Sequence, residues 1–297
     1  MPLTAPTSPR VVPPLLHALR LPQWIKNGFL FAPLVFAGKF TDPALVLRVV
    51  LGALAFSLAA SAVYLANDLS DAPDDRRHPR KRLRPIASGA VSPALAGVTA
   101  AVLVMGGVGA AYVLAPAFGA VVAGYVAVNV LYTWQLKHVV IVDVFCLAAG
   151  FVLRVEGGSI LAGVPASDWL LVCTSVLALF LGFSKRRHEV LAQADSGTRR
   201  VLDEYSPQFL DKMMTLAESV TVIAYLMYVV SPETEARFGR GMLLTVPFVL
   251  YGVFRYQYLV YHRHAAENPT DTLFTDRPLL AAVVGWILTA GLVVLYH

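Results

Sequence analysis

Four oxygen-bearing side chains follow a long apolar stretch at regular spacing, in the pattern NDxxDxxxD: Asn67, Asp68, Asp71 and Asp75. On a helix, steps of four residues place Asn67, Asp71 and Asp75 along one face, with Asp68 on its flank. Carboxylates this close repel one another, and the negative end of a helix adds to the repulsion unless a cation is bound. Mg2+ binds through a few carboxylates and shares its other positions with phosphate oxygens and water. The pattern therefore predicts a Mg2+ site at these four residues.

The same acids could instead pair with the bases that follow them in a solvated loop. The metal site is favoured because the acids lie at the end of a predicted membrane span, where charged groups are costly and usually functional. Pro73 complicates the geometry, since proline disrupts a helix interior. We expect the helix to be kinked or to restart after Ala72.

Six bases come directly after the acids. They could anchor this loop on one side of a membrane. Arginine also offers paired donors to phosphate oxygens, so bases beside a Mg2+ site would suit a substrate that carries a diphosphate. The six are Arg76, Arg77, Arg80, Lys81, Arg82 and Arg84.

The elements that must position these groups are membrane helices. The chain has 297 residues, of which 57% are hydrophobic and 14% are charged, against about 25% charged in soluble domains. Both cysteines, Cys146 and Cys173, lie in apolar runs and form no disulfide framework. We expect an all-α, polytopic membrane protein with a single domain over residues 1–297, of which residues 1–20 are mobile. Apolar windows of about 20 residues predict nine spans, at roughly 25–40, 44–66, 92–114, 117–135, 139–162, 167–184, 209–230, 240–261 and 279–296.

Charge separates the two sides of this arrangement. The N-terminus and alternate loops carry 19 of the 24 Lys and Arg residues. By the positive-inside rule, that side and the N-terminus are cytoplasmic. The bases follow the membrane side and do not form a soluble basic domain, so a nucleic-acid partner is not expected.

At the NDxxDxxxD motif the sequence resembles the UbiA superfamily of intramembrane prenyltransferases, which have nine transmembrane helices and bind a diphosphate through Mg2+. The resemblance covers nearly the whole chain. That superfamily carries a second acidic motif after its sixth span, expected here between residues 185 and 211. The sequence has FSKRRHE at 183–189 in its place.

One branch of the superfamily, the polyprenyl-phosphate phosphoribosyltransferases, fits the basic replacement better. The resemblance to this branch implies phosphoribosyl diphosphate as donor, decaprenyl phosphate as acceptor and Mg2+ as cofactor, in a step toward a lipid-linked arabinose donor for cell-wall arabinan. It also implies a bacterial cell membrane location with a cytoplasmic active site, and leaves homo-oligomerisation open. The matching stretches are RLPQWIKN at 20–27, NDLSDAPDDRRHPRKRLRPIASG at 67–89, YTWQLKH and IVDVF within 132–145, GFVLR at 150–154, FSKRRHE at 183–189 and NPTDTLFTDRPLL at 268–280.

The resemblance assigns roles to individual residues. Asp71 and Asp75 are expected to be catalytic and to bind the metal together with Asn67 and Asp68. The expected substrate-binding residues are Lys26, Asn67, Arg76, His78, Lys81, Arg82, Lys137, Arg154, Lys185, Arg186 and Glu189.

Several of these assignments have a plainer alternative. Arg154, inside a predicted span, either contacts substrate or pairs with another helix. Lys26 and Lys185 could be anchors at helix ends. Asp143 is expected to pair with Lys137 or Arg154 and not to bind metal. The glycines at 106, 107, 109, 157 and 158 are expected to allow close helix contacts.

Two other functions stay open. An aromatic prenyltransferase of the same superfamily would use a prenyl diphosphate, although the missing second acidic motif argues against it. A transporter of anionic lipid would line a path with bases, but the inverted pair of broken helices typical of many transporters is not evident.

Overall fold

The computed structural model describes residues 13–79, 81–193, 202, 204–262 and 269–296. Residues 1–12, which belong to the segment predicted to be mobile, lie outside this range, as do Arg80 and Asn268 of the quoted motifs. Throughout the described part the regular structure is helical, without a strand. The all-α prediction is confirmed.

Eight helical segments are long and apolar enough to cross a membrane, among the residues that the structure describes. Each coincides with a predicted span, so the chain is a multi-pass membrane protein. They are α3 (Pro43–Asp75), α4 (Pro93–Leu114), α5 (Pro116–Trp134), α6 (Val142–Ala162), α7 (Asp168–Gln193), α9 (Pro207–Val230), α13 (Arg277–Tyr296) and the run Pro232–His262, which joins α10 (Pro232–Phe238), η4 (Gly239–Thr245) and α11 (Val246–His262).

Local sequence explains where these helices begin. Proline occupies the first helical position of several of them, where its missing N–H has no intrahelical partner in any case. The residue before it often supplies a cap: the side chain of Asp42 accepts from the amide of Ala44 at 2.9 Å, and Ser92 accepts from Leu95 at 3.2 Å.

The first predicted span differs from the others. Residues 21–36 are helical, but as the 3-10 helix η1 (Leu21–Phe31) followed by the short α2 (Ala32–Phe36). This segment is too short to count with the eight, so the number nine is not confirmed. Before it, α1 (Pro14–Ala18) buries Ala18 in a cluster with Leu65 of α3.

Two predictions about helix ends differ from the structure. α3 continues as α-helix through Pro73 to Asp75, so of the two alternatives at Pro73 the restart after Ala72 is wrong. One proline near a helix end removes a single backbone bond, which the long packed helix tolerates. α7 continues to Gln193, so FSKRRHE at 183–189 lies on a helix and not in a loop.

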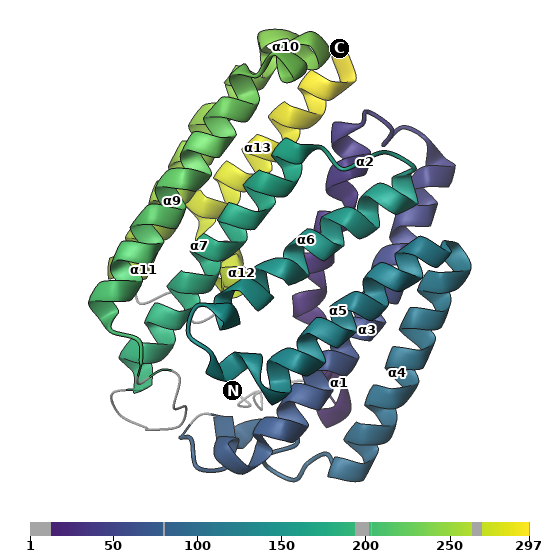
Figure 1. The fold of residues 1–297 in the computed structure, drawn as a ribbon, viewed down its shortest axis with the longest axis vertical. Helices are drawn as coiled ribbons and strands as arrows, with labels where there is room; N and C mark the ends of the chain where they lie inside the picture. Colours follow the sequence, from purple (N-terminus) through teal and green to yellow (C-terminus); the bar gives the residue numbers. More distant parts are fainter. Residues whose placement is uncertain (1–12, 80, 194–201, 203, 263–268, 297) are drawn as a thin grey trace, which may run out of the picture.

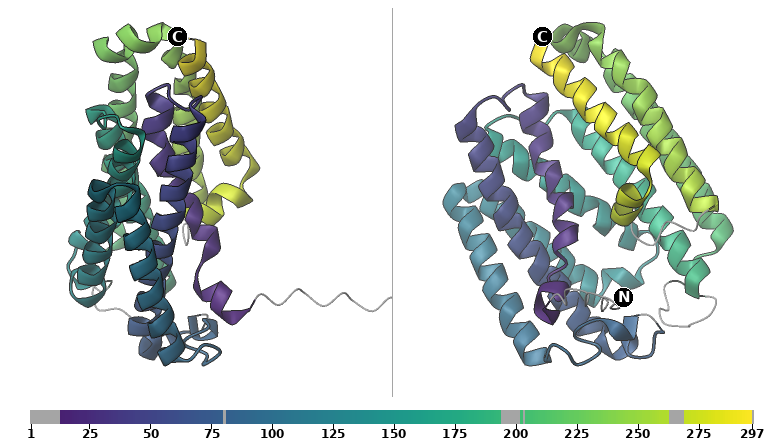
Figure 2. Two further views of the ribbon diagram at one scale, coloured as in Figure 1. Left: turned by 90° about the vertical axis from the view of Figure 1, so that its right-hand side faces the viewer. Right: turned by 180° about the vertical axis from the view of Figure 1, so that it is seen from behind.

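The helices form a bundle in two halves (Figure 1). One buried cluster joins η1, α2, α3, α4, α5 and α6, and a second joins α6, α7, α9, α11 and α13. α6 therefore contributes to both halves. Seen from behind, η1 runs along α3, and the C-terminus lies at the opposite end of the bundle from α1 (Figure 2).

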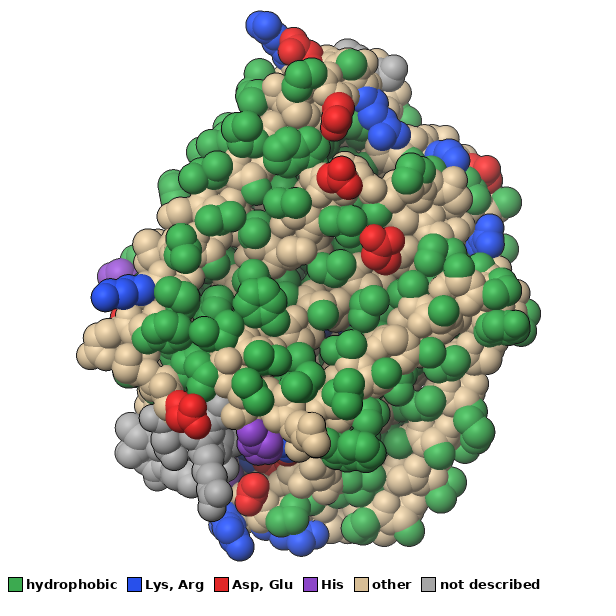
Figure 3. All heavy atoms as spheres, in the orientation of Figure 1, with side chains coloured by type: hydrophobic (Ala, Val, Ile, Leu, Met, Phe, Trp, Pro, Cys, Tyr) green, Lys and Arg blue, Asp and Glu red, His purple; other side chains and the backbone are tan. Residues whose placement is uncertain are grey.

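The outer surface agrees with a membrane environment. In Figure 3, hydrophobic side chains cover most of the face, and the Lys and Arg side chains lie mainly near its rim. Exposed large hydrophobics are found on most of the long helices, for example Val113 of α4 and Leu244 of η4. Such a surface is suited to lipid and not to water.

Glycines bring some helices together and not others. A Cβ on Gly158 of α6 would lie 2.1 Å from the carbonyl oxygen of Leu30, and one on Gly107 would lie 2.8 Å from that of Ala55. A Cβ on Gly106 or Gly109 would meet nothing within 4 Å. The predicted role in close contact therefore holds for Gly158 and Gly107 and is wrong for Gly106 and Gly109.

Candidate functional site

The last turns of α3 carry the NDxxDxxxD side chains. Asp68 and Asp75 are buried, each 4% exposed. Asn67 and Asp71 are partly exposed on the same end of the helix. Because α3 remains helical as far as Asp75, the spacing of four keeps Asn67, Asp71 and Asp75 on one face, as predicted.

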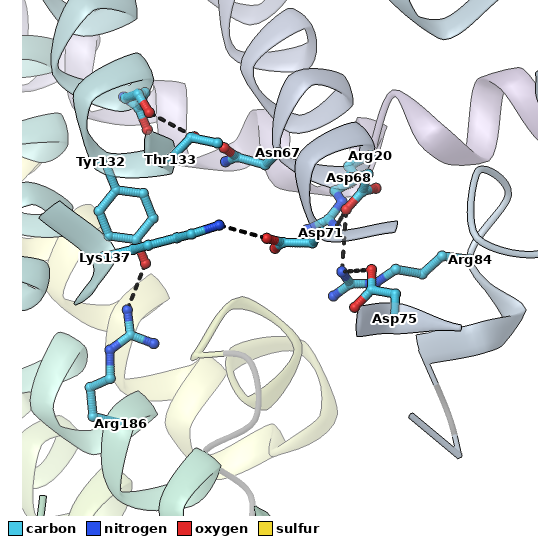
Figure 4. Close-up of polar contacts among 11 residues, drawn as sticks. Arg20, Asn67, Asp68, Asp71, Asp75, Arg84, Tyr132, Thr133, Lys137 and Arg186 are labelled. Carbon is cyan, nitrogen blue, oxygen red and sulfur yellow. Dashed lines mark hydrogen bonds and ion pairs between the residues drawn. The ribbon is translucent and has the colours of Figure 1, made fainter. Parts of the chain in front are cut away.

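Two arginines neutralise the buried acids (Figure 4). Arg84 donates to Asp75 at 2.7 Å and lies 3.3 Å from Asp68. Arg20 donates to Asp68 at 2.6 Å. Arg20 has a positive φ of 53° and its guanidinium lies over the ring of Tyr64, which fixes the start of η1 against α3.

A lysine from another part of the chain faces the third acid. Lys137 lies on the short 3-10 helix η3 (Leu136–His138), and its Nζ is 2.8 Å from Oδ1 of Asp71. Both side chains are largely buried, at 13% and 17% exposed. Figure 4 shows the lysine extended toward the acid. This contact brings a predicted substrate-binding base against a predicted catalytic acid.

The end of α5 contributes two hydroxyl groups. The hydroxyl of Thr133 lies within hydrogen-bond distance of the amide oxygen of Asn67 and of the carbonyl of Asn129, and its one proton is shared between these two acceptors. Tyr132, the preceding residue, accepts from Arg186 of α7 at 2.8 Å. The last turn of α5 therefore lies between the acidic end of α3 and the basic segment of α7.

Arg186 is the centre of a buried polar network. It is 1% exposed and donates to Asp143 of α6 and to Glu189 one turn along α7. Lys185 lies 4.0 Å from Glu189. The expected pairing of Asp143 with Lys137 or Arg154 is wrong, because the first turn of α6 packs against α7 and presents Asp143 to Arg186.

Tyr205, just before α9, completes this network. Its hydroxyl donates to Oδ1 of Asp143 at 2.7 Å and accepts from the amide of Ile141 at 2.6 Å. Burial and the carboxylate of Asp143 raise the pKa of Tyr205. The phenol therefore stays protonated and remains a donor to Asp143.

The remaining predicted bases of the loop after α3 lie at its surface. Arg76 is exposed and donates to the carbonyl of Ala87 at 3.3 Å, and Arg82 is exposed on η2 (Lys81–Leu83). The ring Nδ1 of His78 accepts from the amide of Lys81 at 3.3 Å. Arg76 and His78 thus shape this loop beside the acids.

Arg154 lies within the bundle with neutral partners. It is 4% exposed and donates to Asn27 at 2.7 Å and to the carbonyl of Gly150 at 2.6 Å. Its guanidinium lies 4.9 Å from the ring centres of Phe56 and Tyr125. The structure shows a pairing with another helix, since Asn27 belongs to η1, and it does not test the contact with substrate. Lys26, the neighbour of Asn27, is partly exposed.

The donor set at the end of α3 fits Mg2+ in kind: three carboxylates and an amide oxygen. Among the described residues, however, no group of three or more His, Cys, Asp or Glu converges as a metal site would require. Arg84, Arg20 and Lys137 hold the carboxylates instead. A metal would have to compete with these side chains for the same oxygens.

Several residues of this region were not among the predicted site residues. Thr133 and Tyr132 lie within the quoted YTWQLKH stretch, four and five residues before Lys137, which is the one available signal for them. Arg84 was counted only among the loop bases. Arg20 begins the quoted RLPQWIKN stretch, and the fold brings it and Tyr205 here from distant segments.

Residues 28–275 match the UbiA prenyltransferase family. The chain belongs to that family. It is 32% identical to the decaprenyl-phosphate phosphoribosyltransferase of Mycobacterium tuberculosis over 95% of this chain and 94% of that protein. It is 31% identical to the decaprenyl-phosphate phosphoribosyltransferase of Mycolicibacterium smegmatis, over 97% and 94%. The resemblance inferred from the motifs is thereby confirmed.

A solved structure of a UbiA homolog from Archaeoglobus fulgidus, bound to DMAPP and Mg2+, has the same fold. The TM-score is 0.71 at 19% identity, and the match covers 95% of this chain and 99% of that one. The bundle described above is thus a UbiA fold.

Proposed function

We propose that this UbiA family protein transfers the 5-phosphoribosyl group from phosphoribosyl diphosphate to decaprenyl phosphate, with Mg2+ as cofactor and release of diphosphate. Two relatives named for this activity share about a third of their residues with it over nearly their full length. The observation that carries the proposal is the contact of Lys137 with Asp71, because it brings a predicted substrate-binding base against the acidic cluster at one end of the bundle.

The proposed donor has phosphate groups on both ends of a sugar and therefore needs two anion sites. The carboxylates of Asp68, Asp71 and Asp75, with Asn67, would hold Mg2+ and through it the diphosphate. Lys137 is aimed at this cluster and could bind phosphate oxygens once Asp71 turns to the metal. The basic residues 185–187 of α7 lie beyond it, in the place of a second acidic motif.

The reaction breaks the bond between C1 of the ribose and the diphosphate oxygen, and the electron pair leaves with the diphosphate. An oxygen of the lipid phosphate forms the new bond to C1. That phosphate is already an anion at neutral pH, so no general base is needed. Bound Mg2+ would stabilise the charge that develops on the leaving diphosphate.

The side chains of this site would act mainly through charge and orientation. Arg84 and Arg20 neutralise Asp68 and Asp75, and Arg84 would be available to a diphosphate oxygen if Mg2+ took its place at these carboxylates. Thr133 holds the amide of Asn67 in a fixed orientation. We further infer a bacterial cell membrane location with this end of the bundle cytoplasmic, and a place before a lipid-linked arabinose donor for arabinan.

A donor comparison tests the proposal. Purified protein in detergent is given Mg2+, decaprenyl phosphate and phosphoribosyl diphosphate labelled in the ribose, and the label in the organic extract is measured together with released diphosphate. We expect equal amounts of labelled lipid and diphosphate. No transfer from phosphoribosyl diphosphate, together with transfer of a prenyl group from prenyl diphosphate to an aromatic acceptor, would indicate an aromatic prenyltransferase. Lipid movement without diphosphate release would indicate a transporter.

A further inference from the structure

We propose that Tyr205 is a positioning residue, whose hydroxyl holds the turn between α5 and α6 so that Lys137 faces Asp71. The effect on substrate expected from this role rests on the proposed function. The tether itself is a property of the substrate-free protein and can be measured without any substrate.

The turn contains a strained residue. Ile141, directly before α6, has a φ of +71°. A β-branched side chain rarely adopts a positive φ, because Cβ then crowds the neighbouring backbone. Such a conformation persists only where the surroundings hold it, and it is found most often at functional sites.

Tyr205 supplies the contact that holds Ile141. Its hydroxyl accepts from the Ile141 amide at 2.6 Å and donates to Asp143 at 2.7 Å. Asp143 is 0% exposed and is fixed by Arg186 and by the amide of Val144. With its proton directed at the carboxylate, the hydroxyl presents a lone pair to the amide. Ile141 and Asp143, two positions apart, are thus held by the same hydroxyl group.

Lys137 is four residues before Ile141, and backbone hydrogen bonds restrain the segment around and between them. The amide of His138 donates to Gln135 at 3.0 Å, and that of Asp143 donates to Val139 at 3.1 Å. Because these hydrogen bonds restrain the backbone, we expect a change in its conformation at Ile141 to be transmitted to Lys137. We infer that the position of the lysine ammonium depends on the Tyr205 hydroxyl.

Replacing Tyr205 with Phe isolates this effect. The ring still stacks on Phe209 of α9, whose centroid lies 6.1 Å away, and Asp143 keeps Arg186. Only the hydroxyl is removed. Tyr261→Phe is the matched control, because the Tyr261 hydroxyl also donates to an aspartate, Asp211, at 2.9 Å, but far from this turn in the sequence.

The first measurement is hydrogen–deuterium exchange of residues 136–143 in the substrate-free protein. Y205F should speed exchange of the Ile141 amide about tenfold, the effect of losing one buried hydrogen bond, and Y261F should leave it unchanged. The second is the dissociation constant of phosphoribosyl diphosphate with Mg2+. Y205F should raise it about tenfold, and Y205F combined with Lys137→Met should match Lys137→Met alone.

Unchanged exchange in Y205F overturns the tether. Faster exchange in Y205F together with wild-type affinity for the donor overturns the positioning role. So does a double variant whose dissociation constant is raised by the product of the two single effects, since independent sites add in free energy. If the wild-type protein does not bind phosphoribosyl diphosphate while Y205F still exchanges faster, the proposed function fails and the tether stands.

Discussion

The Nζ of Lys137 lies 2.8 Å from Oδ1 of Asp71, although the two residues are 66 positions apart. This contact joins the end of α3 to the turn before α6. It also places the acidic motif beside a polar network that continues through Tyr132 to Arg186. In a membrane protein, ionisable side chains that gather in this way are typical of functional sites.

Asp71→Asn should reduce turnover at least about 100-fold, because the neutral amide removes the negative charge that would attract Mg2+ and that forms the ion pair with Lys137. The fold should persist, since Asp71 lies near the end of α3 and asparagine has nearly the same size and shape. Steady-state kinetics and gel filtration of the purified variant measure the two effects. Asp74→Asn, an exposed neighbour on the same turn, is the control. Wild-type turnover in D71N would remove Asp71 from the site.

Arg84→Met should make the protein depend on Mg2+ for stability. The guanidinium bridges Asp68 and Asp75, and its loss leaves Asp75 buried without this partner. We expect the Tm in EDTA to fall by about 5 °C or more, and Mg2+ to restore most of that loss, because the metal would bind the same carboxylates.

Arg82→Met, an exposed base of the same loop, should change the Tm little under either condition. The comparison is made by measuring the Tm of the wild type, R84M, R82M and D71N, each once in Mg2+ and once in EDTA. If the Tm of R84M were the same in Mg2+ and in EDTA, this would count against a metal at these carboxylates.

Arg154→Met should destabilise the protein without weakening donor binding. The side chain links α6 to η1 through Asn27 and is enclosed by aromatic rings. Its loss takes a hydrogen bond from buried Asn27, which keeps only Ser57 at 2.7 Å. We expect a Tm lower by several degrees with an unchanged donor dissociation constant. A normal Tm with weaker donor binding would instead make Arg154 a substrate contact.

Gly158→Ala should be among the most damaging small substitutions in the bundle. Its Cβ would lie 2.1 Å from the carbonyl oxygen of Leu30, a backbone atom that cannot move without shifting η1. Gly109→Ala should be neutral, as its Cβ would meet nothing within 4 Å. The expression level and the Tm of the two variants are compared. Equal values for both variants would mean that η1 does not pack closely on α6.

The sequence predicts the helices well because apolar length is a local property. Eight predicted spans are confirmed, and the spacing of Asn67, Asp71 and Asp75 gives the correct helical face. Errors arise where the surroundings override a local signal. Pro73 suggested a break, yet α3 continues through it. The charged residues after position 184 suggested a loop, yet they extend α7 and bury Arg186 against Asp143.

The partners of the charged groups could not be read from the sequence. Asp143 had two plausible bases nearby in the chain, and the packing of α6 on α7 selected a third, 43 residues away. Arg20 and Tyr205 make their contacts across the fold, Arg20 with Asp68 and Tyr205 with Ile141 and Asp143, and residue spacing does not predict these contacts. Helix packing decides such pairings, and helix packing depends on the whole chain.

The most direct test of this account is a structure of the protein with Mg2+ and phosphoribosyl diphosphate bound. We predict the diphosphate at the end of α3, with metal on Asp71 and Asp75 and with Lys137 turned from Asp71 to a phosphate oxygen. A donor bound at the other end of the bundle, or one that leaves the contact of Lys137 with Asp71 intact and the acids without metal, would contradict it.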